Sequence, residues 1–385
     1  MAKQTVVDSD GHILEPADLW EKYLEPKYRE HAIRLREDER GLEYFEIDRK
    51  KSMMLRGGTL ASLGGAYQDA RELLTPGKVK YWEGAKRTPG AIDPDARVRE
   101  MDAEGIDAAI LYPTIGIIWE GEVADAELSA AYCRAYNNYL IDFCSKHSDR
   151  LIPIAHINLL DVDMAVAEVK RVTGKAKGIF TTPVPRNGRS VGDRYYDPFW
   201  AACEAAHLPV ATHVQVRPDF LGAGMNVIQG ERGQDPIHER SGIWLLFMQL
   251  TEDSKLGMNC VFQGGVLERF PKLQYVILEI GCGFLPSWIE RADGKYDMFG
   301  FSTGMKHKPS ELLLRNCSIS AEPDEACIPE IARQVGAKRL LWATDYPHID
   351  AYNNPVKELR EHIAPLPAED QEWILGKSAV ELYRL

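Results

Sequence analysis

Val6-Val7-Asp8-Ser9-Asp10-Gly11-His12 is a short apolar strand that ends in an acid–glycine–histidine triplet. Alternate side chains of a strand share a face, so Asp10 and His12 are expected to point the same way. Gly11 between them leaves room for the backbone to approach a ligand closely. The stretch therefore predicts a first strand that offers a carboxylate and an imidazole to a metal ion at its C-terminal end.

A regular alternation of helical and strand patterns follows this stretch from residue 93 onward. Together with the first strand, the apolar runs predict eight strands, at about 6–12, 107–112, 151–157, 178–182, 209–214, 274–279, 316–320 and 339–345. Helical spacing lies between them, at 94–104, 124–147, 162–173, 198–207, 243–252 and 285–299, and two more helices end the chain. Eight strands that alternate with helices are typical of an α/β (β/α)8 TIM barrel, which would span residues 1–385. An open, doubly wound sheet is the alternative.

Residues 25–92 interrupt this pattern after the first strand. They are charged near residues 34–51, glycine-rich at Gly57-Gly58 and Gly64-Gly65, and contain scattered prolines. Such a length is too great for a structureless loop in a compact domain. We therefore expect an insertion that packs as a cap over the mouth of the site, with a peripheral decoration as the alternative.

Composition restricts the classes of function. The 385 residues are 45% hydrophobic, which supports a large core, and the net charge of −12 argues against a nucleic-acid partner. No apolar run approaches the roughly 18 residues of a membrane span. The seven cysteines are an odd number without a close pair and are expected to be reduced, so a cytoplasmic protein is predicted. A homodimer is the expectation from base rates.

Ionisable and polar residues stand where the predicted strands end. In chain order these residues are Asp10, His12, Tyr112, His156, Thr182, His213, Glu279, Glu322, Asp345 and His348. Functional residues of such barrels lie at the C-terminal ends of the strands. Buried ionisable groups are costly unless they are paired or bind a metal. Several such endings on one rim therefore predict a metal centre.

Four stretches carry a family resemblance, and they run at residues 8–12, 208–213, 265–273 and 341–348, with a fifth in the final helix at 374–383. The chain resembles the amidohydrolase superfamily, in particular the amidohydrolase-related group that includes aminocarboxymuconate-semialdehyde decarboxylase. The resemblance covers most of the chain outside residues 25–92. It implies a metal-dependent enzyme that acts on a small-molecule substrate, with no membrane partner.

The resemblance also implies roles for individual residues. Asp10, His12, His213 and Asp345 would bind a divalent metal, and Asp345 would also act as acid and base. The sixth strand departs from the family pattern. Decarboxylase members carry a catalytic histidine in this region, where this chain has Glu279 and no histidine. That departure argues against decarboxylation.

Further donors extend the expected site. Glu279, His348 and Glu322 are candidate metal ligands, and Glu279 is also a candidate catalytic group. His156, Tyr112 and Arg217 are candidate substrate contacts. This oxygen-rich set with histidines suits Zn, Mn or Fe, as one ion or as two.

A metal-dependent hydrolase is the function that the sequence favours, because a metal lowers the pKa of bound water and a carboxylate can move its proton. It would cleave a C–N or C–O bond of a small organic substrate. A metal-dependent, non-oxidative decarboxylase is the first alternative. A dinuclear non-haem iron oxygenase and a non-catalytic ligand-binding barrel are the others.

Overall fold

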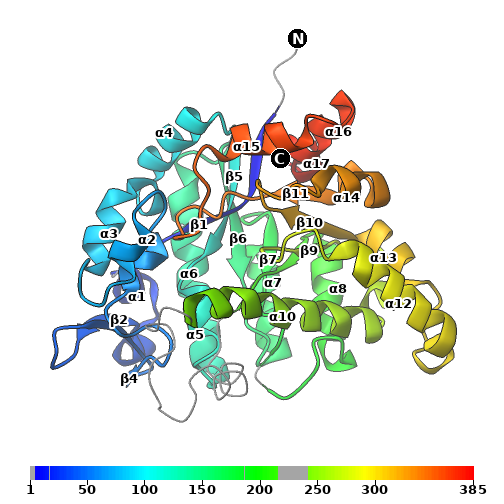
Figure 1. Cartoon of the computed structure of the whole chain (residues 1–385). Helices are drawn as coiled ribbons and strands as arrows, with labels where there is room; N and C mark the ends of the chain where they lie inside the picture. Colours follow the sequence, from blue (N-terminus) through cyan, green and yellow to red (C-terminus); the bar gives the residue numbers. More distant parts are fainter. Residues whose placement is uncertain (1–4, 17, 186, 216–241) are drawn as a thin grey trace.

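Figure 1 shows a ring of strands surrounded by helices in the computed structural model, which describes residues 5–16, 18–185, 187–215 and 242–385. Each strand pairs in parallel with the next along the chain. The strands are β1 (Val7–Ile13), β5 (Ala108–Pro113), β6 (Leu151–His156), β7 (Gly178–Phe180), β8 (Val210–Thr212), β9 (Tyr275–Ile277), β10 (Cys317–Ala321) and β11 (Leu340–Trp342).

The first and last strands come together where their sequences carry site residues. The backbone N–H of Asp345 donates to the carbonyl of Asp10 at 3.1 Å, and the N–H of His12 donates to the carbonyl of Tyr346 at 2.7 Å. These two bonds join β1 to the segment that follows β11. The sheet is thus a nearly closed barrel, which confirms the predicted (β/α)8 fold and excludes the open sheet.

The helices of the barrel begin where the sequence offers capping residues. Asp93, Asp125 and Asp161 each accept a hydrogen bond from a backbone N–H in the first turn of the following helix. Those helices are α4 (Pro94–Glu104), α6 (Ala126–Ser145) and α7 (Val162–Val172). The other helices of the outer layer are α8 (Asp197–Ala206), α10 (Gly242–Gln263), α12 (Leu285–Phe299), α13 (Pro309–Asn316), α14 (Ile328–Val335), α15 (Pro355–Ile363), α16 (Ala368–Glu372) and α17 (Ser378–Tyr383).

The segment between β1 and α4 is more regular than the sequence suggested. It contains a three-stranded antiparallel sheet formed by β2 (Arg34–Glu37), β3 (Glu43–Ile47) and β4 (Lys50–Lys51). The short helices α1 (Leu19–Tyr23), α2 (Ala70–Leu73) and α3 (Tyr81–Arg87) accompany it at one side of the barrel (Figure 1).

The core of the barrel lies between the strands and the surrounding helices. Buried aliphatic and aromatic side chains from β5, β6, β9 and β10 pack there against those of α6, α7, α8 and α14. All seven cysteines are free thiols. Among the described residues, no helix is both long enough and apolar enough to cross a lipid bilayer.

Candidate metal centre

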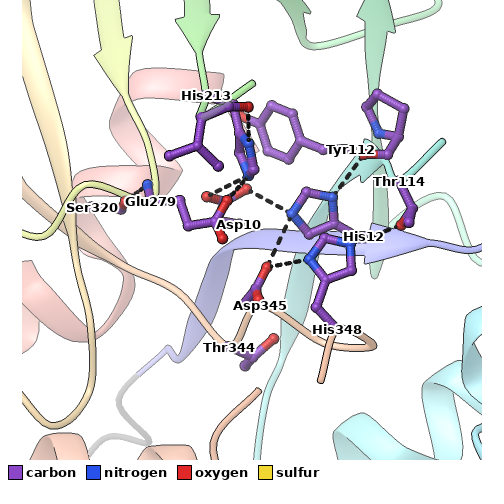
Figure 2. Close-up of polar contacts among 12 residues, drawn as sticks. Asp10, His12, Tyr112, Thr114, His213, Glu279, Ser320, Thr344, Asp345 and His348 are labelled. Atoms are coloured by element: carbon purple, nitrogen blue, oxygen red, sulfur yellow. Dashed lines mark hydrogen bonds and ion pairs between the residues drawn. The ribbon is translucent and has the colours of Figure 1, made fainter. Parts of the chain in front are cut away.

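Six side chains from four parts of the chain converge at the C-terminal ends of the strands (Figure 2). They are Asp10 and His12 of β1, His213 after β8, Glu279 after β9, and Asp345 and His348 after β11. His12 Nε2 lies 3.5 Å from Asp10 Oδ1 and 3.4 Å from Asp345 Oδ1. His213 Nε2 lies 3.7 Å from Asp10 Oδ2 and 2.9 Å from Glu279 Oε2. The structure therefore brings together six of the seven residues that the sequence offered as ligands.

Several donor atoms of this cluster are buried without a hydrogen-bond partner among the described residues. They are Asp10 Oδ1, His12 Nε2, His213 Nε2, Glu279 Oε2 and Asp345 Oδ2. Among these atoms, His213 Nε2 and Glu279 Oε2 lie 2.9 Å apart as an ion pair. Because a buried polar atom without a partner costs free energy, five such atoms facing one another indicate a missing partner. Mixed nitrogen and carboxylate donors fit a divalent metal ion.

The two histidines nearest the carboxylates are held in fixed orientations. Nδ1 of His12 donates to the carbonyl of Pro113 at 2.9 Å, and Nδ1 of His213 donates to the carbonyl of Val214 at 3.0 Å. A carbonyl only accepts hydrogen bonds, so each Nδ1 must carry the proton. Each ring therefore directs Nε2 into the cluster, as metal-binding histidines do.

Burial shapes the charges of the cluster. It raises the pKa of Asp10 well above its usual value, and together with the neighbouring imidazoles it lowers the pKa of His12 well below its own. Burial alone lowers the pKa of His213, but the Glu279 and Asp10 carboxylates outweigh that effect and raise it to about 9. A cation at the centre would compensate the carboxylates in place of a proton on His213.

Local backbone geometry aims these side chains. Glu279 and Asp345 both adopt left-handed conformations, with φ of 52° and 54°, just beyond the ends of β9 and β11. Such values are uncommon for residues other than glycine and often mark functional sites. In β1 the pairing with β5 shifts register between Asp8 and Gly11, so the first residue of the predicted ligand pair, Asp10, lies within this irregularity of the strand.

Gly11 has a different role from the one predicted for it. A Cβ at this position would collide with the Arg97 guanidinium and the Asp8 carboxylate, so the missing side chain makes room for protein groups. Arg97 in turn donates to the carbonyl of His12 at 2.8 Å. The absence of a side chain at Gly11 thus allows Arg97 to bind the backbone of the ligand His12.

A buried network that was not predicted from the sequence supports the ligands of β1 and β11. Asp8 accepts hydrogen bonds from the N–H of Thr344 at 3.0 Å and from its hydroxyl at 2.8 Å. It also accepts from the N–H of Asp10 at 3.3 Å. Asp8 thereby ties Asp10 to the residue that precedes Asp345, across the closing seam of the barrel. The sequence feature that could have indicated this network is the second acid of the first strand, Asp8, two residues before Asp10.

Two cavities open beside the cluster. One, of about 170 Å³, reaches Glu279 and His348 and is walled mainly by apolar side chains, which include Met54, Leu63, Leu74, Ile117, Ile118 and Phe247. The other, of about 190 Å³, is rich in carboxylates: Asp10, Glu279, Glu322, Asp345 and Asp350. The first cavity suits an apolar group next to the cluster, and the second is lined by the carboxylates of the cluster.

The remaining predicted residues lie in other settings. Glu322 lines the acidic cavity, accepts a hydrogen bond from Tyr352 at 2.6 Å, and has a pKa raised to about 7 by burial. Thr182 donates to Gln215. These hydrogen bonds of Glu322 and Thr182 involve none of the six converging side chains.

Tyr112 and His156, two of the three predicted substrate contacts, do not line these two cavities. Tyr112 is fully buried, with its hydroxyl 2.9 Å from that of Tyr383. His156 is fully buried with Nε2 2.7 Å from a Glu120 oxygen. Both side chains therefore pack inside the barrel, and this placement argues against direct substrate contact. Arg217 lies outside the described residues.

Comparison with known proteins places this geometry in a family. The chain is 23% identical over 271 residues to gamma-resorcylate decarboxylase from Rhizobium sp. (strain MTP-10005), which covers 66% of this chain and 76% of that protein. An amidohydrolase from Mycobacterium avium subsp. paratuberculosis K-10 superposes over 100% of both chains, with 25% identity and a TM-score of 0.79.

A dihydroxybenzoic acid decarboxylase from Polaromonas sp. JS666, solved with bound manganese, shares the fold over 100% of this chain and 98% of its own. Its identity is 16% and its TM-score 0.68. The family model described as Amidohydrolase matches residues 7–385. The match spans the barrel and all the residues of the cluster. This chain therefore belongs to the amidohydrolase family.

Proposed function

We propose that this chain is a metal-dependent, non-oxidative decarboxylase of a small hydroxylated aromatic acid. The observation that carries the proposal is a set of buried nitrogen and oxygen donors without hydrogen-bond partners among the described residues, at the end of an apolar cavity. The names of the related gamma-resorcylate and dihydroxybenzoic acid decarboxylases support the reaction and the substrate class. Decarboxylation thus replaces hydrolysis as the first candidate reaction.

Asp10, His12, His213 and Asp345 would hold the metal ion in this proposal. Manganese is the first candidate because the Polaromonas enzyme was solved with it, and the donors suit Fe and Zn as well. The bound ion would supply positive charge to hold the substrate carboxylate and an adjacent hydroxyl oxygen. Glu279 and His348 would then orient the ligands and the substrate.

Asp345 is the proposed proton donor to the ring. Its Oδ2 is buried without a hydrogen-bond partner among the described residues, so this oxygen is available to carry the proton while Oδ1 faces His12 and His348. When the bond between the ring carbon and the carboxylate carbon breaks, its electron pair stays on the ring carbon. That carbon takes the proton from Asp345, and the carboxylate leaves as CO2. Glu279 is the alternative donor.

The segment at residues 25–92 would form one wall of the substrate site. Met54, Thr59, Ser62, Leu63 and Leu74 of this segment line the apolar cavity that reaches His348. Their contacts support the cap that we predicted from the sequence. An aromatic ring would lie between these side chains and the aliphatic residues that follow β5.

A metal-dependent hydrolase is the second candidate. It is favoured by the loop after β9, which carries Glu279 and no histidine, so that two carboxylates flank the same donor cluster. In that reaction Glu279 or Asp345 would carry the proton from water to the leaving group. An iron oxygenase and a non-catalytic barrel have weaker support.

The homodimer and the cytoplasmic location stay predictions.

Product analysis distinguishes these reactions. The manganese-loaded protein is incubated with gamma-resorcylate and other dihydroxybenzoic acids, and CO2 release is measured. A parallel panel of amides, esters and lactones is followed by ¹⁸O incorporation from labelled water. CO2 release from at least one phenolic acid supports the decarboxylase, whereas label incorporation without CO2 release supports the hydrolase. Oxygen uptake would favour the oxygenase.

A further inference from the structure

A separate cavity of about 420 Å³ lies at the other end of the barrel. Its walls include Pro209, Gln274 and Arg339, which stand directly before β8, β9 and β11. The proposed metal centre lies beyond the C-terminal ends of the same strands. The two sites are therefore separated by the length of the barrel, and this cavity belongs to no step of the proposed reaction.

Positive charge is concentrated in the walls of this cavity. Two carboxylates line it, Glu204 and Glu381, against five cationic side chains, which are Lys272, Arg315, Lys338, Arg339 and Arg384. The whole chain carries a formal charge of −12, so the net positive charge of this cavity is opposite in sign to the charge of the whole chain. Such a local reversal concentrates anions.

Two of these cations have partners within the protein. Lys338 forms an ion pair with Glu381 at 2.6 Å, and Arg315 donates to the carbonyl of Leu267 at 2.6 Å. Arg315, in the last turn of α13, thereby satisfies a backbone carbonyl of the short helix Val266–Arg269. These contacts give both cations a structural role.

The other three cations form no close ion pair among the described residues. The side chains of Lys272, Arg339 and Arg384 form no ion pair with a carboxylate in the described part of the chain. Arg339 is half-buried, and burial lowers the pKa of its guanidinium more than the nearby Glu381 carboxylate, which pairs with Lys338, raises it. A charged group that loses water without gaining a close ion pair is costly, so an anion at this place would offset that cost.

We propose that this cavity is a binding site for a small multivalent anion, either a phosphate-bearing molecule or a dicarboxylate. Arg339 would be its central contact, because a guanidinium can bind both phosphate and carboxylate through two parallel hydrogen bonds. Lys272 and Arg384 would neutralise the remaining charge from the rim. The volume of the cavity lies in the range of small-molecule sites.

Calorimetric titration of the full, manganese-loaded chain with inorganic phosphate and with succinate, at constant ionic strength, tests this proposal. We expect saturable binding of at least one probe. Arg339→Gln should weaken that binding by about tenfold, as expected for the loss of a charge-assisted contact. Arg333→Gln is the matched control, since Arg333 is exposed on α14 and pairs with Glu330 outside the cavity. It should leave affinity unchanged.

Lys272→Gln provides a second variant, because Lys272 is exposed and its loss should leave the fold intact. It too should weaken binding of the same probe. Binding at the metal centre would be insensitive to both substitutions, so equal affinity in wild type, Arg339→Gln and Lys272→Gln would overturn the proposal. Failure of both probes to saturate the wild-type chain would overturn it as well. The probe that binds identifies the anion class.

Discussion

His348 Nδ1 lies 2.7 Å from Asp345 Oδ1, while the second oxygen of the same carboxylate, Oδ2, is buried without a hydrogen-bond partner among the described residues. The other ring nitrogen of His348 lies 3.0 Å from the hydroxyl of Thr114. Burial lowers the pKa of His348 to about 4, so its ring is neutral near pH 7. A neutral ring can donate to Asp345 and accept from Thr114 at once. The pair thereby fixes one oxygen of Asp345 and leaves the other for the reaction.

Asp345→Asn should slow turnover strongly, because the amide cannot deliver a proton to the substrate. We expect kcat to fall about 10²- to 10⁴-fold, the usual contribution of general acid catalysis, with the melting temperature nearly unchanged. Asp324→Asn is the control, since Asp324 is an exposed acid on the same rim. If Asp345→Asn kept more than a tenth of wild-type activity, the assignment of the proton donor would be wrong.

Glu279→Gln separates two roles of this carboxylate. Loss of bound metal would indicate a ligand, whereas retained metal with a lower kcat would indicate a group that orients or transfers a proton. We expect metal to be retained, because Asp10, His12, His213 and Asp345 form the proposed ligand set. Elemental analysis and steady-state kinetics on the same preparation give both quantities. Full activity with full metal content would remove Glu279 from the site.

Thr344→Val tests the seam between β1 and β11. The substitution removes the hydroxyl that donates to the buried Asp8 carboxylate at 2.8 Å. We expect the free energy of unfolding to fall by about 1–3 kcal/mol, because one oxygen of Asp8 loses a buried partner. Urea unfolding measures the change. Thr75→Val, at an exposed helix end, should change stability far less.

Leu63→Ala tests the proposed wall from residues 25–92. Leu63 lines the apolar cavity beside His348, so its truncation should raise KM for the substrate by up to about tenfold. Leu35→Ala is the control because Leu35 belongs to β2 and does not line the cavity. Equal kinetic constants for Leu63→Ala and wild type would argue for the peripheral decoration instead.

Metal removal should destabilise the whole chain. Five donor atoms of the cluster are buried without a hydrogen-bond partner among the described residues, so the bound ion should stabilise the folded state by mass action. At 100 times its dissociation constant the ion would contribute about 2.7 kcal/mol. Thermal unfolding before and after chelation should therefore show a drop that added manganese reverses. An unchanged melting temperature after complete removal would contradict this role.

The sequence was most informative where apolar periodicity and strand ends coincide. The predicted helices at 94–104 and 285–299 have the bounds of α4 and α12, and the eight predicted strands all exist. The cluster could be anticipated because burying an ionisable residue at the end of a strand is costly unless that residue binds a partner. His213 and Asp345 are examples.

Other features depend on contacts that a linear pattern does not contain. The same strand-end rule chose Tyr112 and His156, yet their polar groups meet Tyr383 and Glu120 in the interior. Thr114 carries no such signal, because its partner His348 lies far along the chain. The small sheet of β2–β4 has short strands, and its burial alternates only within β3. Tertiary contacts therefore decide these positions.

Elemental analysis of metal per chain, on protein purified without chelators, is the decisive test of the proposed metal centre. We expect about one Mn, Fe or Zn ion per chain in the wild type, and loss of that ion in His213→Ala. His207→Ala, at an exposed position at the end of α8, should keep it. Wild-type protein without bound metal, and without metal uptake after incubation with manganese, would contradict the proposed centre and the chemistry built on it.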